Sequence, residues 1–240
     1  MNWQPIQRPT EVAESRLIAA ILTGEFQMNS SLPSERDLAA QLGVTRPTLR
    51  EALQRLARDG WIDIQHGRST RVRNYWEEGN LGVLEGLARH PEHAPADFVP
   101  NLLQVRQLLA PTYARLAVAR RAAAVCALLA DYANLTDTPD YLAKADWELH
   151  RRLTILSGNP IFTLILNGFG ELYQQMAVVY FSLPASRESS RAYYARLLTA
   201  AQAGDAAAAE QYTTAAVTES LQLWRRAMYS AALPPTGGKR

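Results

Sequence analysis

The sequence has a single cysteine, which excludes an internal disulfide framework. Cys126 lies in the alanine-rich stretch 122–130, where we expect a small buried hydrophobe rather than a reactive thiol. No charged-then-apolar leader opens the chain, and no apolar run approaches the roughly 20 residues needed to cross a bilayer. We therefore expect a cytoplasmic protein that has no membrane partner.

The sequence also lacks the common catalytic signatures. It has no G-x-S-x-G elbow, no phosphate-binding glycine loop that opens a helix after a strand, and no cysteine beside a plausible base. These absences argue against an enzyme, so no catalytic residue is assigned. No histidine follows His150, which limits metal sites in the last third of the chain.

Charge is close to balanced over the 240 residues, with a net charge of +2, but it is not evenly distributed. Residues 34–73 contain eight arginines and five acids, whereas the chain from Trp76 onward has fifteen basic and fifteen acidic residues. The local excess is entirely arginine, the side chain best suited to bidentate contacts with phosphate and guanine. The first third of the chain is therefore the candidate nucleic-acid-binding part.

Helix signals organise this first third. Apolar spacing predicts a helix over 10–23, with Thr10 as its cap and Gly24 at its end. Ser34 and Asp37 resemble a capping box for a helix to Leu42, and Thr45 caps a third helix that Gly60 ends. Residues 61–65 and 69–73 alternate like two strands around a turn at 66–67. Three helices and a hairpin predict a winged helix-turn-helix over 1–74.

A polar connector over 75–80 separates this domain from a segment in which every stretch reads as helical. We expect helices over 81–89, 97–132 with a kink at Pro111, 140–157, 160–181, 186–203 and 205–230. The fold class is therefore mainly α, with a winged helix-turn-helix followed by a bundle of about seven helices over 81–231. Residues 232–240 are expected to form a loose tail.

The run from Pro33 to Leu56, closed by Gly60, closely resembles the DNA-binding domain of the GntR family of transcription regulators. In such domains the N-terminal end of the recognition helix enters the major groove, where Arg46 and Arg50, spaced i and i+4, share one face. The resemblance implies contacts to double-stranded DNA from the helices and from the turn of the hairpin. The implied DNA-binding residues are Arg36, Thr45, Arg46, Thr48, Arg50, His66, Gly67 and Arg68.

Further motifs resemble one branch of that family, the fatty-acid-responsive FadR subfamily. They include the run from Leu53 to Trp61, the segments 64–67 and 157–168, and Glu219-Ser220 with Trp224. The resemblance implies a homodimer that binds an inverted repeat and a long-chain acyl-CoA that releases the DNA, with no cofactor. The implied effector-binding residues are Asn101, Arg106, His150, Tyr180, Tyr194, Glu219, Ser220 and Trp224. Taken alone, the aromatic residues of this set read more simply as core.

Two residues depart from the subfamily. Val217 replaces a glycine next to the implied ligand contacts, where its bulk would narrow the cavity, and His150 replaces a phenylalanine. Asp146 and His150, at i and i+4, also resemble half of the metal site of related regulators that sense small carboxylic acids. Those regulators add two later histidines that this chain lacks, so a hydrogen-bonded Asp–His pair is the simpler reading and no metal is assigned. A regulator that senses a small carboxylic acid, with or without metal, remains the alternative.

Overall fold

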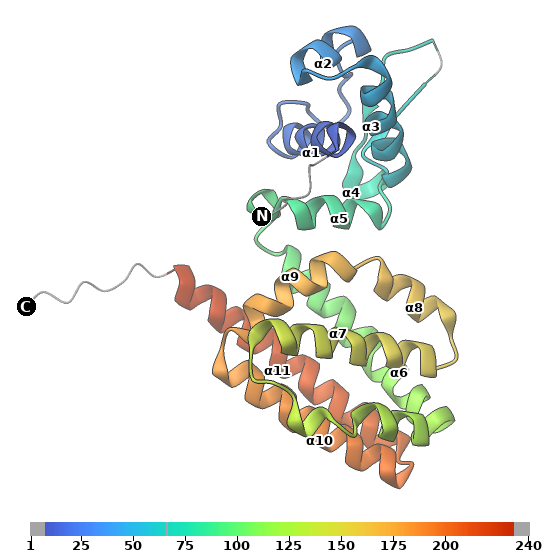
Figure 1. Ribbon diagram of the computed structural model, residues 1–240, viewed down its shortest axis with the longest axis vertical. Coiled ribbons are helices and arrows are strands. Elements are labelled where there is room, and N and C mark those ends of the chain that lie inside the picture. The colour runs from blue at the N-terminus through green and yellow to red at the C-terminus, as the bar shows by residue number, and fades with distance from the viewer. Residues whose placement is uncertain (1–7, 66, 233–240) are drawn as a thin grey trace, which may run out of the picture. The chain divides into compact units, whose positions relative to one another are not determined.

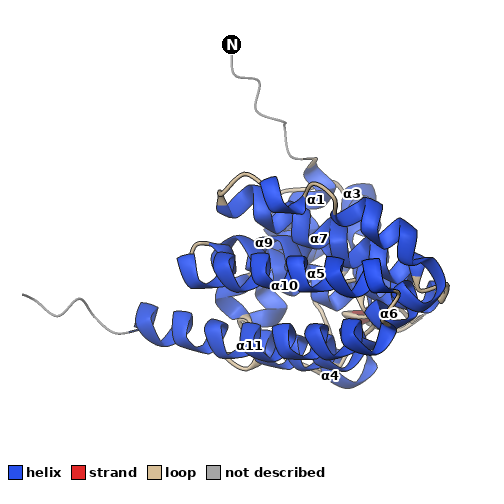
Figure 2. Ribbon diagram, turned by 90° about the horizontal axis from the view of Figure 1, so that it is seen from below, coloured by secondary structure: helices blue, strands red, loops and turns tan. Residues whose placement is uncertain are grey.

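The computed structural model describes residues 8–65 and 67–232 and consists of two compact units, residues 1–94 (unit 1) and 95–240 (unit 2) (Figure 1). Helices are the main elements of both units, and the strands are short (Figure 2). None of the helices in the described ranges is both long and apolar enough to span a bilayer.

Unit 1 is a winged helix built around its third helix. Its elements are α1 (Pro9–Leu22), α2 (Glu35–Leu42), α3 (Arg46–Asp59), β1 (Ile62–Asp63), β2 (Arg71–Val72), α4 (Tyr75–Glu78) and α5 (Gly82–Arg89). Helix α3 packs against α1, α2 and α5. Its apolar stripe of Leu49, Leu53 and Leu56 is buried, as are Leu17 and Ile18 of α1, the helix that packs against α3. The predicted fold of this domain is confirmed.

Local caps fix the two helices of the helix-turn-helix. The Ser34 hydroxyl accepts a hydrogen bond from the Asp37 backbone amide and donates one to the Asp37 carboxylate, and the Thr45 hydroxyl accepts from the Thr48 amide. Both caps are as predicted. The predicted cap at Thr10 is wrong: α1 starts one residue earlier, at Pro9, and the Thr10 hydroxyl instead donates to Glu51 of α3 at 3.1 Å.

Gly60 ends α3 in the left-handed conformation, at φ +93°. A Cβ atom there would lie 2.8 Å from the Cα of Gly79, so both the backbone angle and the space require glycine.

The hairpin is shorter than its sequence pattern predicts. Among the described residues of the hairpin, only Ile62 with Val72 and Asp63 with Arg71 pair as antiparallel strands, and Ile62 and Val72 are fully buried. The sequence pattern predicted a strand to residue 65 with Ile64 facing inward. Ile64 is instead 45% exposed, and the strand ends at Asp63. Residues 29–32 extend the sheet on the other edge of β2, where a bridge joins Ser31 to Arg71.

Residues 75–94 pack within unit 1. The predicted connector over 75–80 contains α4, whose Tyr75 ring lies 4.8 Å from that of Trp61, while Trp76 is 48% exposed. Helix α5 packs on α1 and α3, and Gly86 leaves room for the Trp61 ring. The contacts thus divide the chain after Ala94, whereas composition placed the boundary at 75–80.

Unit 2 is an all-helical bundle, as predicted. Its helices are α6 (Phe98–Leu129), α7 (Pro139–Leu156), α8 (Pro160–Asn167), α9 (Gly170–Phe181), α10 (Pro184–Ala203) and α11 (Ala206–Ala232). The long helix α6 packs against α7, α10 and α11, and α7 also packs against α8 and α9 (Figure 1). The main core lies between α6, α7, α10 and α11 and includes Tyr113, Leu149, Leu153 and Leu197.

Two helix predictions in unit 2 need correction. The backbone of α6 leaves helical geometry at Arg121 (φ −146°, ψ 41°), ten residues after Pro111, where the kink was expected. Residues 160–181 form two helices, because the chain turns at Gly168 and Phe169. Residues 233–240 of the predicted tail lie outside the described residues.

Candidate functional site

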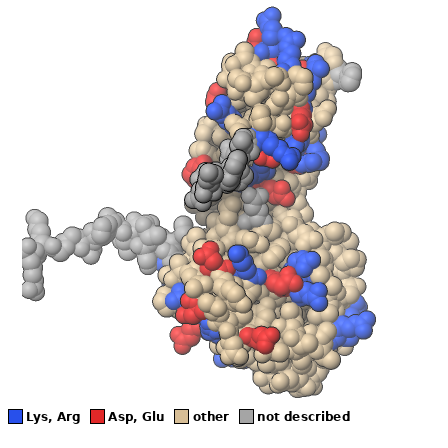
Figure 3. Space-filling model, in the orientation of Figure 1, with Lys and Arg blue, Asp and Glu red and all other residues tan. Residues whose placement is uncertain are grey.

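Unit 1 exposes basic side chains around the start of α3. Arg46, Arg50 and Arg36 are exposed, the last with 76% of its side chain accessible, and arginine side chains gather at the end of unit 1 where α2 lies (Figure 3). The hydroxyls of Thr45 and Thr48 lie 2.8 Å apart, which orders the first turn of α3. The start of α3 therefore presents four exposed or half-exposed hydrogen-bond donors, which suits contact with a polyanion. They are Thr45, Arg46, Thr48 and Arg50.

The three arginines of this surface differ in their pairing. The Arg50 Nε donates to Glu35 of α2 at 2.8 Å, and the Arg36 Nε donates to the neighbouring Asp37 at 3.3 Å. Arg46 makes no ion pair to any side chain in the described ranges. Its guanidinium is therefore the one already available for an incoming partner, whereas Arg50 must leave Glu35 first.

The turn of the hairpin carries fewer of the predicted DNA-binding residues than the start of α3. Gly67 has φ +74° and Arg68 is exposed, so the turn projects a basic side chain into solvent. His66 lies outside the described residues.

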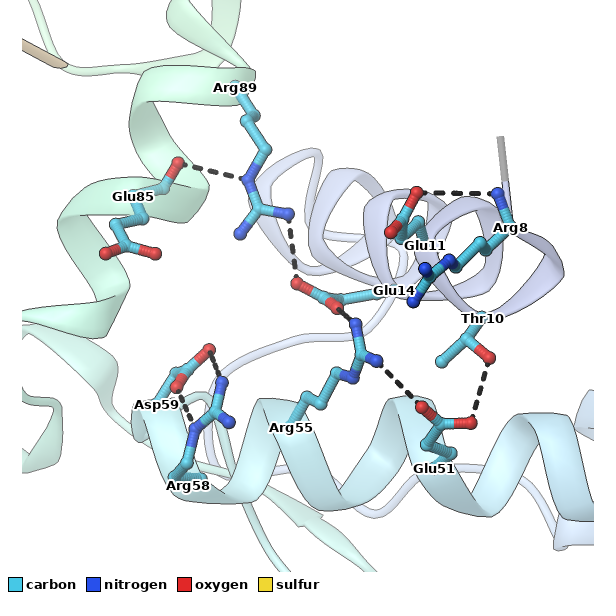
Figure 4. Close-up of polar contacts among 10 residues, drawn as sticks. All are labelled: Arg8, Thr10, Glu11, Glu14, Glu51, Arg55, Arg58, Asp59, Glu85 and Arg89. Atoms are coloured by element: carbon cyan, nitrogen blue, oxygen red, sulfur yellow. Dashed lines mark hydrogen bonds and ion pairs between the residues drawn. The ribbon is translucent and has the colours of Figure 1, made fainter. Parts of the chain in front are cut away.

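A buried carboxylate holds α3 in place. Glu14 of α1, only 6% of whose side chain is accessible, accepts from Arg55 of α3 at 3.5 Å and from Arg89 of α5 at 3.0 Å (Figure 4). Arg55 also donates to Glu51 at 2.7 Å, and Glu51 accepts from Thr10. One acid therefore joins three helices, because α1, α3 and α5 each contribute a side chain to it.

Unit 2 contains an apolar cavity of about 110 Å³. Its walls come from the first half of α6, from α7, α8 and α9, and from the second half of α11. The lining is largely aliphatic and aromatic and includes Leu102, Leu109, Phe162, Ile165, Leu166, Phe169, Leu172, Met176 and Phe181. Few polar groups interrupt it, which is typical of a site for an apolar ligand.

Half of the predicted effector residues line this cavity, namely Arg106, Tyr180, Ser220 and Trp224. The others lie elsewhere. Asn101 is exposed and donates to Asp97 at 3.2 Å, and Glu219 is exposed and accepts from Ser189 at 2.8 Å. His150 and Tyr194 are almost fully buried and lie behind the wall, where they contact Arg106 and Asp146. Val217 packs in the main core rather than among the lining side chains.

A buried ion pair interrupts the apolar wall. The Arg106 Nη2 lies 3.4 Å from the Asp146 carboxylate, and the guanidinium stacks over the Tyr173 ring at 5.4 Å. Asp146 also accepts from the hydroxyls of Tyr173 and Tyr194. Burial alone would raise the pKa of Asp146, but Arg106 and these hydrogen bonds outweigh it and hold the pKa below its usual range.

His150 is neutral in this network. Its Nε2 accepts from the Arg106 Nη2 at 2.6 Å, because a guanidinium can only donate, so the proton lies on Nδ1, which is 2.7 Å from the Tyr113 hydroxyl. Burial and the neighbouring Arg106 lower the pKa of His150 to about 3. The Nε2 lone pair of His150 and both oxygens of Asp146 therefore already have partners, which does not fit the metal half-site.

Sequence reasoning missed two features of these sites. The sequence predicts Asp146 as a hydrogen-bond partner of His150 or as half of a metal site, yet His150 Nε2 lies 3.8 Å away. Asp146 instead pairs with Arg106, 40 residues earlier, and the tyrosines that donate to it come from α9 and α10. Glu14 was not singled out, because an acid in a predicted helix reads as solvated unless its partners are known. No local spacing signals Glu14 or the pairing of Asp146 with Arg106.

A winged helix with an arginine-bearing recognition helix, followed by a helical unit with an apolar cavity, defines a DNA-binding transcription regulator. The family description "Bacterial regulatory proteins, gntR family" matches residues 9–72, and the "FadR C-terminal domain" matches residues 73–234. The chain belongs to the FadR branch of the GntR family.

Curated relatives agree with this assignment. The fatty acid metabolism regulator protein of Edwardsiella ictaluri is 43% identical over 206 residues, which cover 86% of this chain and 84% of the relative. The protein of the same name from Serratia proteamaculans is 42% identical, with 80% and 81% covered. Among solved structures, the one described as "Lar controls the expression of the Listeria monocytogenes agr system and mediates virulence" matches with a TM-score of 0.63 at 16% identity. That match covers 93% of this chain and 99% of the other, and it supports the fold.

Proposed function

We propose that this protein is a cytoplasmic repressor of fatty acid metabolism genes, not an enzyme, which binds an operator through unit 1 and is released when long-chain acyl-CoA enters the cavity of unit 2. The observation that carries the proposal is an apolar cavity, lined by Arg106, Tyr180, Ser220 and Trp224, in a chain whose relatives are named as fatty acid metabolism regulators. An acyl chain supplies apolar surface for such a cavity at roughly 0.8 kcal/mol per buried methylene.

The DNA-binding half of the proposal rests on the exposed turn at the start of α3. Arg46 and Arg50 read base edges in the major groove, Arg36, Thr45 and Thr48 contact the backbone, and the hairpin turn at 66–68 probes the minor groove. Two chains bind together as a homodimer, so that two recognition helices meet the two halves of an inverted repeat. Light scattering on the purified protein checks this. One chain has a mass of 26.6 kDa, so the measured mass should be twice that value.

The release step needs a wall that can move. No residue of α8 is fully buried, and Ile161 and Leu164 are 54% and 63% exposed, although Phe162, Ile165 and Leu166 line the cavity. Helix α8 is therefore a loosely packed cover, and a ligand displaces it more readily than α6 or α7. Preferential binding of the ligand to the displaced state shifts the protein away from the DNA-binding state.

A mobility-shift assay on an inverted-repeat operator tests the proposal, with acyl-CoA, free CoA and free fatty acid added separately. We expect release by acyl-CoA alone. Release by none of the three would contradict the proposed effector and leave the DNA-binding role standing. Calorimetry on the Tyr180→Ala, Trp224→Ala double variant should show at least tenfold weaker acyl-CoA binding; unchanged affinity would place the ligand outside this cavity.

A further inference from the structure

The exposed surface at the start of α2 and α3 carries acids as well as arginines. Glu35, the first residue of α2, has 42% of its side chain accessible, and Asp37 has 52%. Three arginines, Arg36, Arg46 and Arg50, share the surface with these two acids, which leaves it with a net charge of +1. The affinity of a protein for DNA of any sequence depends on how many phosphates it neutralises, so the two acids lower its affinity for random DNA.

Glu35 holds one arginine of the recognition helix. The Arg50 Nε donates to the Glu35 carboxylate at 2.8 Å, across the turn that joins α2 to α3. This carboxylate lies at the N-terminus of α2, where the helix dipole favours a negative charge. Asp37 differs, because it pairs with its neighbour Arg36 and also accepts from the Ser34 hydroxyl that caps α2. Of the two acids, Glu35 is therefore the one that restrains a side chain of α3.

The ion pair makes random DNA and a specific site unequal for Arg50. Most base edges do not present the paired acceptors O6 and N7 of guanine. On random DNA, Arg50 therefore exchanges the Glu35 carboxylate only for a phosphate, which replaces one anion by another and leaves Glu35 unpaired beside the DNA. At a guanine in the right place, the same guanidinium forms two hydrogen bonds to the base edge. Because an exposed ion pair is weak, these two bonds are enough to break it.

We propose that Glu35 is a specificity-determining residue, which withholds Arg50 from random DNA and releases it where a guanine edge is presented. The proposal rests on the operator binding proposed above. Glu35 contacts no base in this role. It is a positioning residue that acts through Arg50, and it lowers the affinity for random DNA more than the affinity for the operator.

The variant Glu35→Gln tests this role, because it removes the charge and keeps the shape of the side chain. The operator is obtained by selection from random inverted repeats with the wild-type protein, and binding to operator and to random DNA is measured by fluorescence anisotropy at several salt concentrations. We expect the affinity for random DNA to rise about fivefold and the affinity for the operator by less than about twofold, so the ratio of the two affinities falls. The log–log salt dependence on random DNA should steepen by about 0.9, because Arg50 then neutralises one more phosphate.

Three results would overturn the proposal. They are an equal rise in affinity for both DNAs, no rise in affinity for random DNA, and a loss of operator affinity larger than any change on random DNA. The first would mean that Glu35 acts only as a charge that repels DNA, and the last that it holds Arg50 in place for the base.

A second variant shows whether the effect passes through Arg50. In an Arg50→Ala background the ratio of the two affinities should not respond to Glu35→Gln, because the side chain that Glu35 withholds is gone. A further fall of the ratio by the same factor would contradict a role that acts through Arg50.

The variant Glu77→Gln is the matched control. Glu77 is an exposed acid of α4, at the end of unit 1 opposite α2 (Figure 1). The same change of charge at this position should leave both affinities unaltered. An equal fall of the ratio in Glu77→Gln would show that overall charge, and not the Glu35–Arg50 pair, is responsible.

The outcomes also separate this proposal from the proposed function. A wild-type protein that prefers no selected operator over random DNA would contradict the proposed operator binding, and the role of Glu35 would fail with it. A wild-type protein that prefers the operator, with an unchanged ratio in Glu35→Gln, would overturn the role of Glu35 and leave operator binding standing.

Discussion

Arg46 and Arg50 lie four residues apart on one face of α3, yet their surroundings differ. Arg50 is held by Glu35, while Arg46 has no ion pair within the described residues. An arginine that reads a base edge through two hydrogen bonds contributes about 1–3 kcal/mol to discrimination between bases. Arg46 is the stronger candidate for that role, because binding DNA breaks none of its existing pairs.

Replacing Arg46 by Ala should therefore weaken binding to the operator at least tenfold and binding to random DNA much less. Fluorescence anisotropy with both DNAs measures this. Arg58→Ala is the matched control, because Arg58 is an equally exposed arginine at the other end of α3, paired with Asp59. Equal losses on operator and random DNA would make Arg46 a phosphate contact instead.

His150 gives the protein a specific dependence on pH. The folded state lowers its pKa to about 3, while the unfolded chain has the usual value near 6.5. Between these values the unfolded state binds the extra proton, so the free energy of unfolding falls as the pH falls, by about 1.4 kcal/mol per pH unit.

Urea unfolding from pH 6.5 to pH 4.5 should show this slope in the wild type, and His150→Phe should lack its contribution. Asp146 does not interfere, because its lowered pKa places its titration below this window. Parallel pH dependences of the two proteins would mean that His150 is protonated in the folded state.

At the scale of elements, local chemistry predicted the helix-turn-helix well. Ser34 and Thr45 cap helices through bonds to amides three residues away, so the sequence within one turn contains the whole signal. The break in α6 at Arg121 and the turn at Gly168 have no such local signal. The Arg106–Asp146 pair depends on how α6 packs on α7, and a single sequence does not encode that packing in any spacing.

Glu14 joins α1, α3 and α5, and this junction should stabilise the recognition helix. Because hydrogen bonds to charged groups contribute about 1.5–3 kcal/mol each, we expect Glu14→Gln to cost about 2 kcal/mol in unit 1. Hydrogen exchange should then speed up by about 30-fold for the most protected amides of α3. Glu11→Gln is the control, since Glu11 is exposed on the same helix and, among residues 8–65 and 67–232, accepts only from the Arg8 amide (Figure 4). Identical exchange rates of the α3 amides in the two variants would show that Glu14 does not stabilise α3.

For the whole molecule, the proposed release mechanism makes a quantitative demand. If acyl-CoA lowers operator affinity by some factor, the operator must lower acyl-CoA affinity by the same factor, because the two binding events form a closed thermodynamic cycle. For typical coupling of 1–3 kcal/mol this factor is about 5–150. Calorimetric titration of acyl-CoA into the free protein and into its operator complex gives one factor, and titration of operator into the free and the acyl-CoA-bound protein gives the other. Unequal factors would mean that the operator and acyl-CoA compete through some other process, such as aggregation.

The small volume of the cavity has one more consequence. An engineered cavity of roughly 150 Å³ accommodates a benzene molecule, so a space of about 110 Å³ is too small for a long acyl chain unless the walls separate. Separation costs the same free energy for every ligand, whereas the gain grows by roughly 0.8 kcal/mol with each methylene. A plot of binding free energy against chain length should therefore be a straight line that reaches zero at a finite length rather than at the origin. The protein would then respond to the length of an acyl chain as well as to its presence, and it would not bind acyl groups shorter than that intercept.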